Sequence, residues 1–201
     1  MWCIRRRCRA INRFGHRPAD TRELFRIWYG PDCAPFLLVL SPTPCHLTAL
    51  PLHYLRADMV QRELADVLAH LQVGQTHTFD LLASVTVRKD NHEYALRTDA
   101  ERIQWLQRKG AQHGFAVVNH TDPALSLQCV QSTHLSAQKG QHRQVHLAPG
   151  HYTGQVCITD VAVFVDALCG GIGRSKALGL GLLWLPEWYL PADMQHGESH
   201  P

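Results

Sequence analysis

Residues 170–185 read Gly-Gly-Ile-Gly-Arg-Ser-Lys-Ala-Leu-Gly-Leu-Gly-Leu-Leu-Trp-Leu, and this stretch says more about fold and ligand than any other. Glycines leave backbone N–H groups open to a bound polyanion, because no side chain holds the ligand away. The same stretch contains two cations, and the apolar residues 182–185 have the composition of a buried strand. The pattern predicts a basic loop that leads into a core strand and binds phosphate groups through Gly171, Gly173, Arg174, Ser175 and Lys176.

Nucleotide-binding motifs do not fit this loop. A P-loop follows a strand and precedes a helix, whereas here a helix predicted over residues 160–168 comes first and the strand comes last. The dinucleotide fingerprint requires a third glycine at the position of Lys176. A plain helix-to-strand loop with glycine at the helix C-cap accounts for Gly170 or Gly171, but not for the later glycines and both cations. We therefore expect phosphate binding without a nucleotide-binding fold.

The positive charge of the chain is carried mainly by arginine. The 201 residues have a formal net charge of +3, and arginine outnumbers lysine by 16 to 4. Arginine is the residue preferred for forked contacts to phosphate. Eight arginines lie within the first 30 residues, opposed there by Asp20 and Glu23 alone. Such a local basic field indicates a nucleic acid or an acidic membrane surface as partner.

The cysteine spacing and the hydropathy of the chain argue against a structural zinc site, a membrane span and a secretory signal. The seven cysteines form no Cys-x-x-Cys pair and no His-Glu-x-x-His spacing occurs, so we expect no structural zinc site. Free thiols in apolar surroundings fit a reducing cytoplasm. No apolar run is long enough to span a membrane, and the basic N-terminus lacks the apolar segment of a secretory signal. An organellar transit peptide is an alternative interpretation of residues 1–30.

Strands and helices alternate along the chain in two similar series. In the first half we expect strands over residues 2–8, 36–40 and 78–88, and helices over 21–29 and 57–71. In the second half we expect helices over 99–109 (closed by Gly110) and 160–168. The strands expected there lie over 115–118, 125–130, 145–147, 152–158 and 180–185, with a polar, basic connection at 138–143.

Two consecutive series of βαββαβ character predict an α+β fold made of two tandem ferredoxin-like (RRM-like) domains. We expect an N-terminal domain at residues 1–90 and a C-terminal domain at residues 96–190 that contains the glycine-rich loop. Residues 191–201 show no periodicity and are expected to form a flexible tail.

Three segments carry a resemblance to a known family. Residues 170–183 resemble the C-terminal signature of CasE-type CRISPR RNA endoribonucleases, which belong to the RAMP superfamily. Residues 103–109 (Ile-Gln-Trp-Leu-Gln-Arg-Lys) resemble the helix at the start of that family's second domain. Residues 71–74 (Leu-Gln-Val-Gly) and the strand expected after them resemble the end of its first domain. The resemblance covers the chain from about residue 71 onward.

The resemblance implies an endoribonuclease that binds the hairpin of a CRISPR repeat and cuts precursor CRISPR RNA at the 3′ base of that hairpin. In the family's reaction the ribose 2′-hydroxyl attacks the adjacent phosphate and leaves a 2′,3′-cyclic phosphate and a 5′-hydroxyl. The reaction implied needs no metal and no cofactor. The implied partners are the repeat hairpin and the backbone subunits of a Cascade-like ribonucleoprotein effector complex, without a membrane.

The family pattern places a catalytic histidine, often with a tyrosine three residues before it, at the start of the first helix. When residues 23–28 are laid on that helix, these two positions fall on Thr21 and Pro18. Neither side chain can transfer the protons that the reaction moves. An arginine-rich site without the usual histidine is similar to the divergent processing subunits of type IV systems.

Four residues near the N-terminus are therefore candidates for the chemistry. His16 is the nearest histidine and is a candidate acid or base, with a solvated loop histidine as the alternative. Arg22 and Arg26 can stabilise a pentacovalent phosphate, but arginine stays protonated and is a poor base. Tyr29 is a candidate acid, with helix packing as the alternative.

Further cations are candidates for contacts to RNA. Arg88 and Lys89 end a strand at the domain junction, where RNA would cross. Lys139, His142 and Arg143 lie on a connection between strands that suits the phosphates of a hairpin groove. Two solvated charges at a strand end are the alternative for the first pair, and a solvated turn is the alternative for the second group.

Three residues of the predicted helix over 99–109 fit structural roles better. Arg108 and Lys109 end the helix, where cations complement its dipole without any ligand. Trp105 fits the core better than a stacking platform for a base.

Three functions stay open on the sequence. The first is a repeat-specific endoribonuclease, and the second is a non-cleaving guide-RNA hairpin-binding subunit of the same fold. The third is an unrelated small α+β protein whose basic arm binds nucleic acid without specificity.

Overall fold

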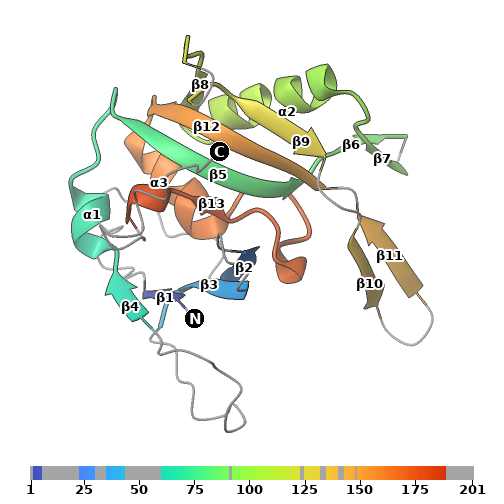
Figure 1. Ribbon diagram of the computed structural model, residues 1–201, viewed down its shortest axis with the longest axis horizontal. Helices are drawn as coiled ribbons and strands as arrows, with labels where there is room; N and C mark the ends of the chain where they lie inside the picture. Colours follow the sequence, from blue (N-terminus) through green and yellow to red (C-terminus); the bar gives the residue numbers. More distant parts are fainter. Residues whose placement is uncertain are drawn as a thin grey trace, which may run out of the picture.

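The computed structural model describes residues 2–5, 23–29, 35–43, 60–90, 92–122, 125–131, 135–139, 143–147 and 149–188. These residues form two main sheets, three helices and two separate hairpins. In Figure 1, helix α2 lies above the strands of the second sheet and the first sheet lies below them. The second sheet is therefore the middle layer of this part of the molecule.

The first sheet contains four strands in the order β2-β3-β1-β4. The strands are β1 (Trp2–Arg5), β2 (Leu24–Tyr29), β3 (Pro35–Ser41) and β4 (Val60–Glu63), and the short helix α1 (Ala65–Ala69) follows β4. β2 and β3 pair antiparallel, whereas β1 is parallel to both of its neighbours. The strand order is that of a ferredoxin-like sheet, and the parallel pairing of β1 departs from that pattern.

The second sheet and its two helices follow the strand–helix–strand–strand–helix–strand order, with the strand predicted at the end of the first series as its first strand. Its elements are β5 (Thr76–Ser84), α2 (Asp99–Gln112), β8 (Phe115–Val118), β12 (Pro149–Ile158), α3 (Val161–Gly170) and β13 (Leu183–Trp184). The strands lie in the ferredoxin-like order β13-β5-β12-β8, and every pair is antiparallel. β9 (Gln128–Gln131) also pairs with β12. β5 lies before residue 90 but belongs to this sheet.

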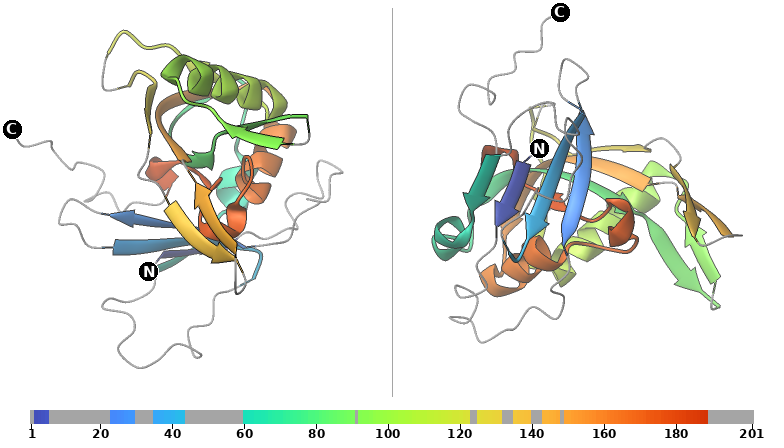
Figure 2. Two further views of the ribbon diagram at one scale, coloured as in Figure 1. Left: turned by 90° about the vertical axis from the view of Figure 1, so that its right-hand side faces the viewer. Right: turned by 90° about the horizontal axis from the view of Figure 1, so that it is seen from below.

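Two hairpins and two short 3₁₀ turns complete the described chain. The hairpins are β6 (Thr86–Lys89) with β7 (His92–Ala95), and β10 (Leu135–Lys139) with β11 (Arg143–Leu147). The turns are η2 (Lys176–Leu178) and η3 (Pro186–Trp188). Figure 2 shows both hairpins projecting away from the body of the molecule.

The two faces of the second sheet have different neighbours because successive strand residues point to opposite sides. Tyr152 of β12 stacks on Trp105 of α2, and Phe115 of β8 contacts Phe164 of α3, so both helices cover this face. The adjacent residue His151 points to the other face, toward β2 of the first sheet. Buried residues of both sheets form one continuous hydrophobic core.

Helix α2 begins where the sequence predicts it, because two reciprocal hydrogen bonds between side chain and backbone cap its N-terminus. The Thr98 hydroxyl accepts a hydrogen bond from the Glu101 N–H, and the Glu101 carboxylate accepts one from the Thr98 N–H. The helix continues past Gly110, so the predicted stop there is wrong. A Cβ on Gly110 would lie 2.6 Å from the carbonyl oxygen of Phe115, so this glycine lets β8 approach the helix.

The helix predicted over residues 21–29 is wrong, because Leu24–Tyr29 is the strand β2. Leu24 and Arg26 are buried, whereas Ile27 is 54% exposed, which is the two-residue period of a strand. The aromatic and β-branched residues of this segment also favour a strand. The placement of the family's first helix on residues 23–28 is therefore wrong as well.

Other predicted elements are confirmed in part. The strands over 36–40, 115–118 and 152–158 and the helix capped at Asp160 are present. The helix predicted over 57–71 is instead β4 followed by α1, and the strand over 78–88 is divided between β5 and β6. The strand predicted over 180–185 is reduced to Leu183–Trp184, and β10 was not predicted.

Candidate nucleic-acid interface

The glycine-rich loop connects α3 to β13; one hydrogen bond joins its two ends, and a second ties it to β5. The N–H of Ile172 donates to the carbonyl of Gly181, and the N–H of Gly181 donates to the carbonyl of Leu82, both at 2.7 Å. Gly171 ends α3 with a φ of 74°, and its N–H donates to the carbonyl of Ala167 at 2.8 Å. The N–H of Gly171 is therefore already used within the fold.

Close packing explains several glycines of this loop. A Cβ on Gly181 would lie 2.4 Å from the carbonyl oxygen of Ile172, and a Cβ on Gly179 would lie 3.1 Å from the ring of Phe25. A Cβ on Gly173 would meet no atom closer than 3.5 Å, so Gly173 is favoured by its φ of 83° alone. Close packing explains Gly179 and Gly181, whereas a helix C-cap explains only Gly171.

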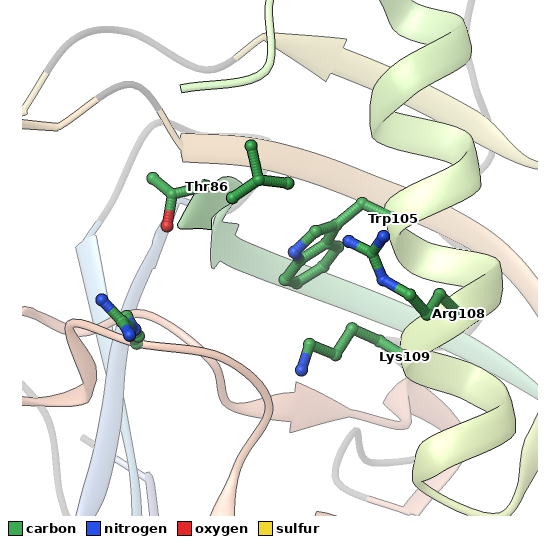
Figure 3. Close-up of a pocket in the computed structure, with 6 residues that line it drawn as sticks. Thr86, Trp105, Arg108 and Lys109 are labelled. Carbon is green, nitrogen blue, oxygen red and sulfur yellow. The ribbon is translucent and has the colours of Figure 1, made fainter. Parts of the chain in front are cut away.

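A pocket of about 380 Å³ beside the loop gathers three cationic side chains. It is lined by Thr86, Val87, Trp105, Arg108, Lys109 and Arg174, which we call the basic pocket. Figure 3 shows Arg108 and Lys109 extending from α2 toward the space that separates the helix from Thr86. Arg174 forms an isolated antiparallel β-bridge with Ser84, the last residue of β5. This backbone pairing holds the loop at this end of the second sheet.

The structure places Arg108 and Lys109 in the lining of the basic pocket, which the sequence did not predict. The sequence assigned both to the end of a helix, and the fold places them beside Arg174, more than 60 residues further along the chain. The Lys109 ammonium also donates to the side-chain oxygen of Gln112 at 3.0 Å. Separate elements thus supply cations to one place, which is what binding of a polyanion needs.

Trp105 forms a rigid wall of the basic pocket. Its side chain is 3% exposed and stacks on Tyr152 with ring centroids 6.0 Å apart, which confirms that it belongs to the core. The Tyr152 hydroxyl donates to the carbonyl of Arg102 at 3.1 Å. Burial raises the pKa of Tyr152 well above its usual range, so this hydroxyl keeps its proton and its hydrogen bond.

The positive field extends from the basic pocket to Lys176. The pKa of His113 is lowered by burial and, in addition, by the positive charges of Lys109 and Lys176. Both lysines therefore act on the same side chain at the C-terminal end of α2. His113 is kept neutral in a region whose charge is already positive.

A second polar group lies on the other face of the sheet and joins the two sheets. Arg26 of β2 forms an ion pair with Asp80 of β5, and its side chain is 6% exposed. His151 Nε2 lies 2.8 Å from the same Asp80 oxygen and 3.3 Å from Nη2 of Arg26. We call Arg26, Asp80 and His151 the His151 cluster. The arginine expected to stabilise the pentacovalent phosphate is thus buried against a carboxylate.

The electrostatics of the His151 cluster are dominated by Asp80. Burial by itself would raise the pKa of Asp80, but hydrogen bonds from His151 and Arg26 and the charge of Arg26 outweigh it, and the pKa is lowered. Asp80 therefore stays ionised. The Arg26 guanidinium also lies over the ring of Trp184, 5.9 Å from its centroid, and Trp184 contacts Trp28 edge-on.

The other predicted site residues lie in several places. Tyr29 ends β2, Arg88 and Lys89 lie in β6, and Ser175 precedes η2 with a φ of 60°. Lys139 and Arg143 are directly paired at the ends of the β10–β11 hairpin. The remaining candidates lie outside the described residues: His16, Arg22 and His142. The predicted roles of all these residues in catalysis or RNA binding stay predictions.

The described residues lack both a metal-binding group of side chains and a membrane-spanning helix. They contain no group of three or more His, Cys, Asp or Glu side chains that could hold a metal ion. In the same part of the chain, no helix has the length and apolarity needed to cross a membrane.

Comparison with known proteins identifies the family. A family model described as CRISPR associated protein matches residues 9–186. The chain belongs to this CRISPR-associated protein family. The sequence-based interpretation as an unrelated α+β protein is therefore wrong.

One curated relative and two solved structures illustrate the likeness. The CRISPR-associated endoribonuclease Cse3 of Thermus thermophilus is 30% identical over 122 residues, which are 56% of this chain and 56% of the relative. The match thus takes in little more than half of the relative's length. CRISPR endoribonuclease Cse3 bound to a 19-nucleotide RNA is 23% identical with a TM-score of 0.67, covering 88% of this chain and 92% of that one. Cas6e from Escherichia coli K-12 is 21% identical with a TM-score of 0.56, covering 83% and 85%. The predicted α+β class with tandem ferredoxin-like domains is confirmed.

Proposed function

We propose that this protein binds the hairpin of a CRISPR repeat and cuts the precursor RNA at the 3′ base of that hairpin. The 2′-hydroxyl attacks the adjacent phosphate, so the products carry a 2′,3′-cyclic phosphate and a 5′-hydroxyl. The protein then stays on the mature guide RNA beside the backbone subunits of a Cascade-like effector complex. Membership of the CRISPR-associated family and the likeness to the endoribonuclease Cse3 support this proposal.

The observation that carries the proposal is the basic pocket. Arg108 and Lys109 from α2 and Arg174 from the glycine-rich loop line one space of about 380 Å³. Arginine binds phosphate with a planar fork, and lysine acts as a compact charge, so the pocket suits the phosphodiester backbone of RNA. The buried Trp105 ring forms a rigid wall between α2 and the loop, and the backbone β-bridge from Arg174 to Ser84 fixes the loop backbone beside it.

Cations beside the phosphate serve catalysis as well as binding. Negative charge on the non-bridging oxygens grows as the 2′-oxygen approaches phosphorus, and fixed positive charges stabilise that state more than the ground state. The reaction also needs a group that takes the proton of the 2′-hydroxyl. Fixed cations can stabilise the charge that a metal ion would otherwise stabilise, so we propose that the reaction proceeds without a metal ion.

A non-cleaving subunit of the same fold is the second candidate function. One observation favours it: Arg26, expected to stabilise the pentacovalent phosphate, is 5% exposed and paired with Asp80. An arginine held in this way cannot reach a phosphate unless the two sheets separate. The basic pocket would still bind the hairpin, so this candidate keeps the RNA-binding part of the proposal.

Incubation of the purified protein with an end-labelled repeat hairpin separates the two functions. Cleavage at one position at the 3′ base of the stem, under single-turnover conditions, is the expected result. A tight complex that leaves the RNA intact would favour the non-cleaving subunit. The matched control is the same RNA with one strand of the stem scrambled, which should be neither cut nor tightly bound. Equal, salt-labile binding of both RNAs would contradict both functions.

A further inference from the structure

The His151 cluster contains a histidine that the sequence analysis did not single out. Its Nε2 lies 2.8 Å from Asp80 Oδ1. Asp80 is ionised and can only accept hydrogen bonds, whereas Nη2 of Arg26, 3.3 Å from the same Nε2, can only donate; the shorter contact to Asp80 favours the ring proton on Nε2. In the neutral ring, Nδ1 then carries the lone pair. None of the described residues forms a hydrogen bond with Nδ1.

His151 differs from its two partners in exposure. The side chains of Arg26 and Asp80 are 6% and 12% exposed, whereas that of His151 is 37% exposed. The buried ion pair fixes one edge of the imidazole, and the rest of the ring reaches the surface. A buried carboxylate that orients a partly exposed histidine is the arrangement by which enzymes hold a proton-transfer group.

The His151 cluster lies at the same end of the second sheet as the basic pocket. His151 is two residues along β12 from Pro149, which pairs with Ser84 of β5. Ser84 in turn forms the bridge to Arg174, which lines the basic pocket. Two residues of a strand span roughly 7 Å. Each strand pairing adds about 5 Å, and the His151 side chain points away from the face that α2 covers, so RNA on Arg174 reaches the histidine by passing around this end of the sheet.

We infer that His151 is the general base of the RNA cleavage and that Asp80 and Arg26 are its positioning residues. This inference rests on the proposed endoribonuclease function. Nδ1 takes the proton of the 2′-hydroxyl while the 2′-oxygen forms its bond to phosphorus and the bond from phosphorus to the 5′-oxygen breaks. The 5′-oxygen takes a proton from water, and His151 returns its proton to solvent. Atoms and charge balance without any further reactant.

The His151→Ala variant tests this inference through the rate of single-turnover cleavage of the repeat hairpin. General base catalysis contributes about 10²–10⁴-fold, so the cleavage rate should fall at least about 100-fold while the Kd for the hairpin changes less than about threefold. The parent's rate should rise with pH, because a base accepts the proton only in its unprotonated form, and the variant should lose this rise. Added imidazole should restore cleavage to His151→Ala, because it can occupy the vacated space and accept the same proton.

Two further variants control for folding and for loss of any histidine. His151→Gln keeps an N–H that can donate to Asp80 but cannot accept the 2′ proton, so it should fold like the parent and cleave as slowly as His151→Ala. His70 is exposed at the end of α1, with its ring bonded to the carbonyl of Asp66, and His70→Ala should cleave at the parent's rate.

The outcomes separate this inference from the function on which it rests. If the parent cuts the hairpin and both His151 variants cut as fast, His151 is not the base, although the endoribonuclease function stands. Slow cleavage by His151→Gln with weakened binding and an unchanged pH profile would also overturn the inference, because it would show a structural role. If the parent binds the hairpin and never cuts it, both the cleavage function and this inference are wrong.

Discussion

Replacement of Gly181 by alanine tests whether the glycine-rich loop is built for close packing. The new Cβ would lie 2.4 Å from the carbonyl oxygen of Ile172, about 1 Å inside ordinary van der Waals contact. Overpacking of this kind costs about 1–3 kcal/mol. An alanine at a φ of 84° costs about 1–2 kcal/mol more. Hydrogen bonds of Gly181 to Ile172 and Leu82 would also be disturbed, so we expect Gly181→Ala to lower the free energy of unfolding by about 3–5 kcal/mol.

Gly173→Ala is the matched control because it shares the backbone conformation but not the collision. Its φ is 83°, and the nearest atom to a Cβ, in the Trp105 ring, lies 3.5 Å away. The free energy of unfolding of Gly173→Ala should fall only by the cost of placing alanine in a left-handed backbone conformation, about 1–2 kcal/mol. Urea unfolding followed by circular dichroism measures both, with midpoints compared at a common slope. Equal losses of stability in the two variants would refute the claim that backbone contact between Gly181 and Ile172 requires glycine.

Two further predictions concern charge. The double variant Arg174→Ala/Lys176→Ala should bind the repeat hairpin more weakly, and the slope of log affinity against log salt should flatten by up to about two. Arg62 is an exposed arginine of β4, and Arg62→Ala should leave the affinity and the slope unchanged. Filter-binding titrations at several salt concentrations measure both quantities. Because the pKa of Asp80 is lowered in the folded protein, its contribution to stability is present above its usual value of 3.8 and lost as the pH falls through the lowered one. Asp80→Asn should remove this acid sensitivity. It should also lower the free energy of unfolding at pH 7 by about 3–5 kcal/mol, because it leaves the Arg26 charge buried and unpaired. Unfolding curves at pH 7 and pH 3 measure both effects.

The parts of the fold that the sequence predicted well are those fixed by local signals. Helix α2 has a capping box at Thr98 and Glu101, and α3 has Asp160 as its N-cap, so nearby residues determine where each begins. From Gly150 to the end of β12, buried and half-buried residues alternate, as expected of a strand. The family signature in the glycine-rich loop likewise needed only the local sequence.

The parts that the sequence missed depend on contacts between distant residues. Arg26 was expected in a helix, but it is buried in a strand because Asp80, 54 residues away, neutralises its charge. Arg108 belongs to the basic pocket only because the loop brings Arg174 beside it. His151 has no local motif at all, and its contact with Asp80 spans 71 residues. Single-sequence patterns carry no signal for such pairs.

The central claim is that this protein cuts its RNA by attack of the 2′-hydroxyl, and the chemistry of the product ends tests it most directly. The measurement is cleavage of the repeat hairpin in EDTA, with the normal ribose and with a 2′-deoxyribose at the scissile position. We expect the normal RNA to be cut to a 2′,3′-cyclic phosphate and a 5′-hydroxyl, and the deoxy-substituted RNA to stay intact. Cleavage of the deoxy-substituted RNA, or cleavage that stops in EDTA and returns with a divalent metal, would contradict the account.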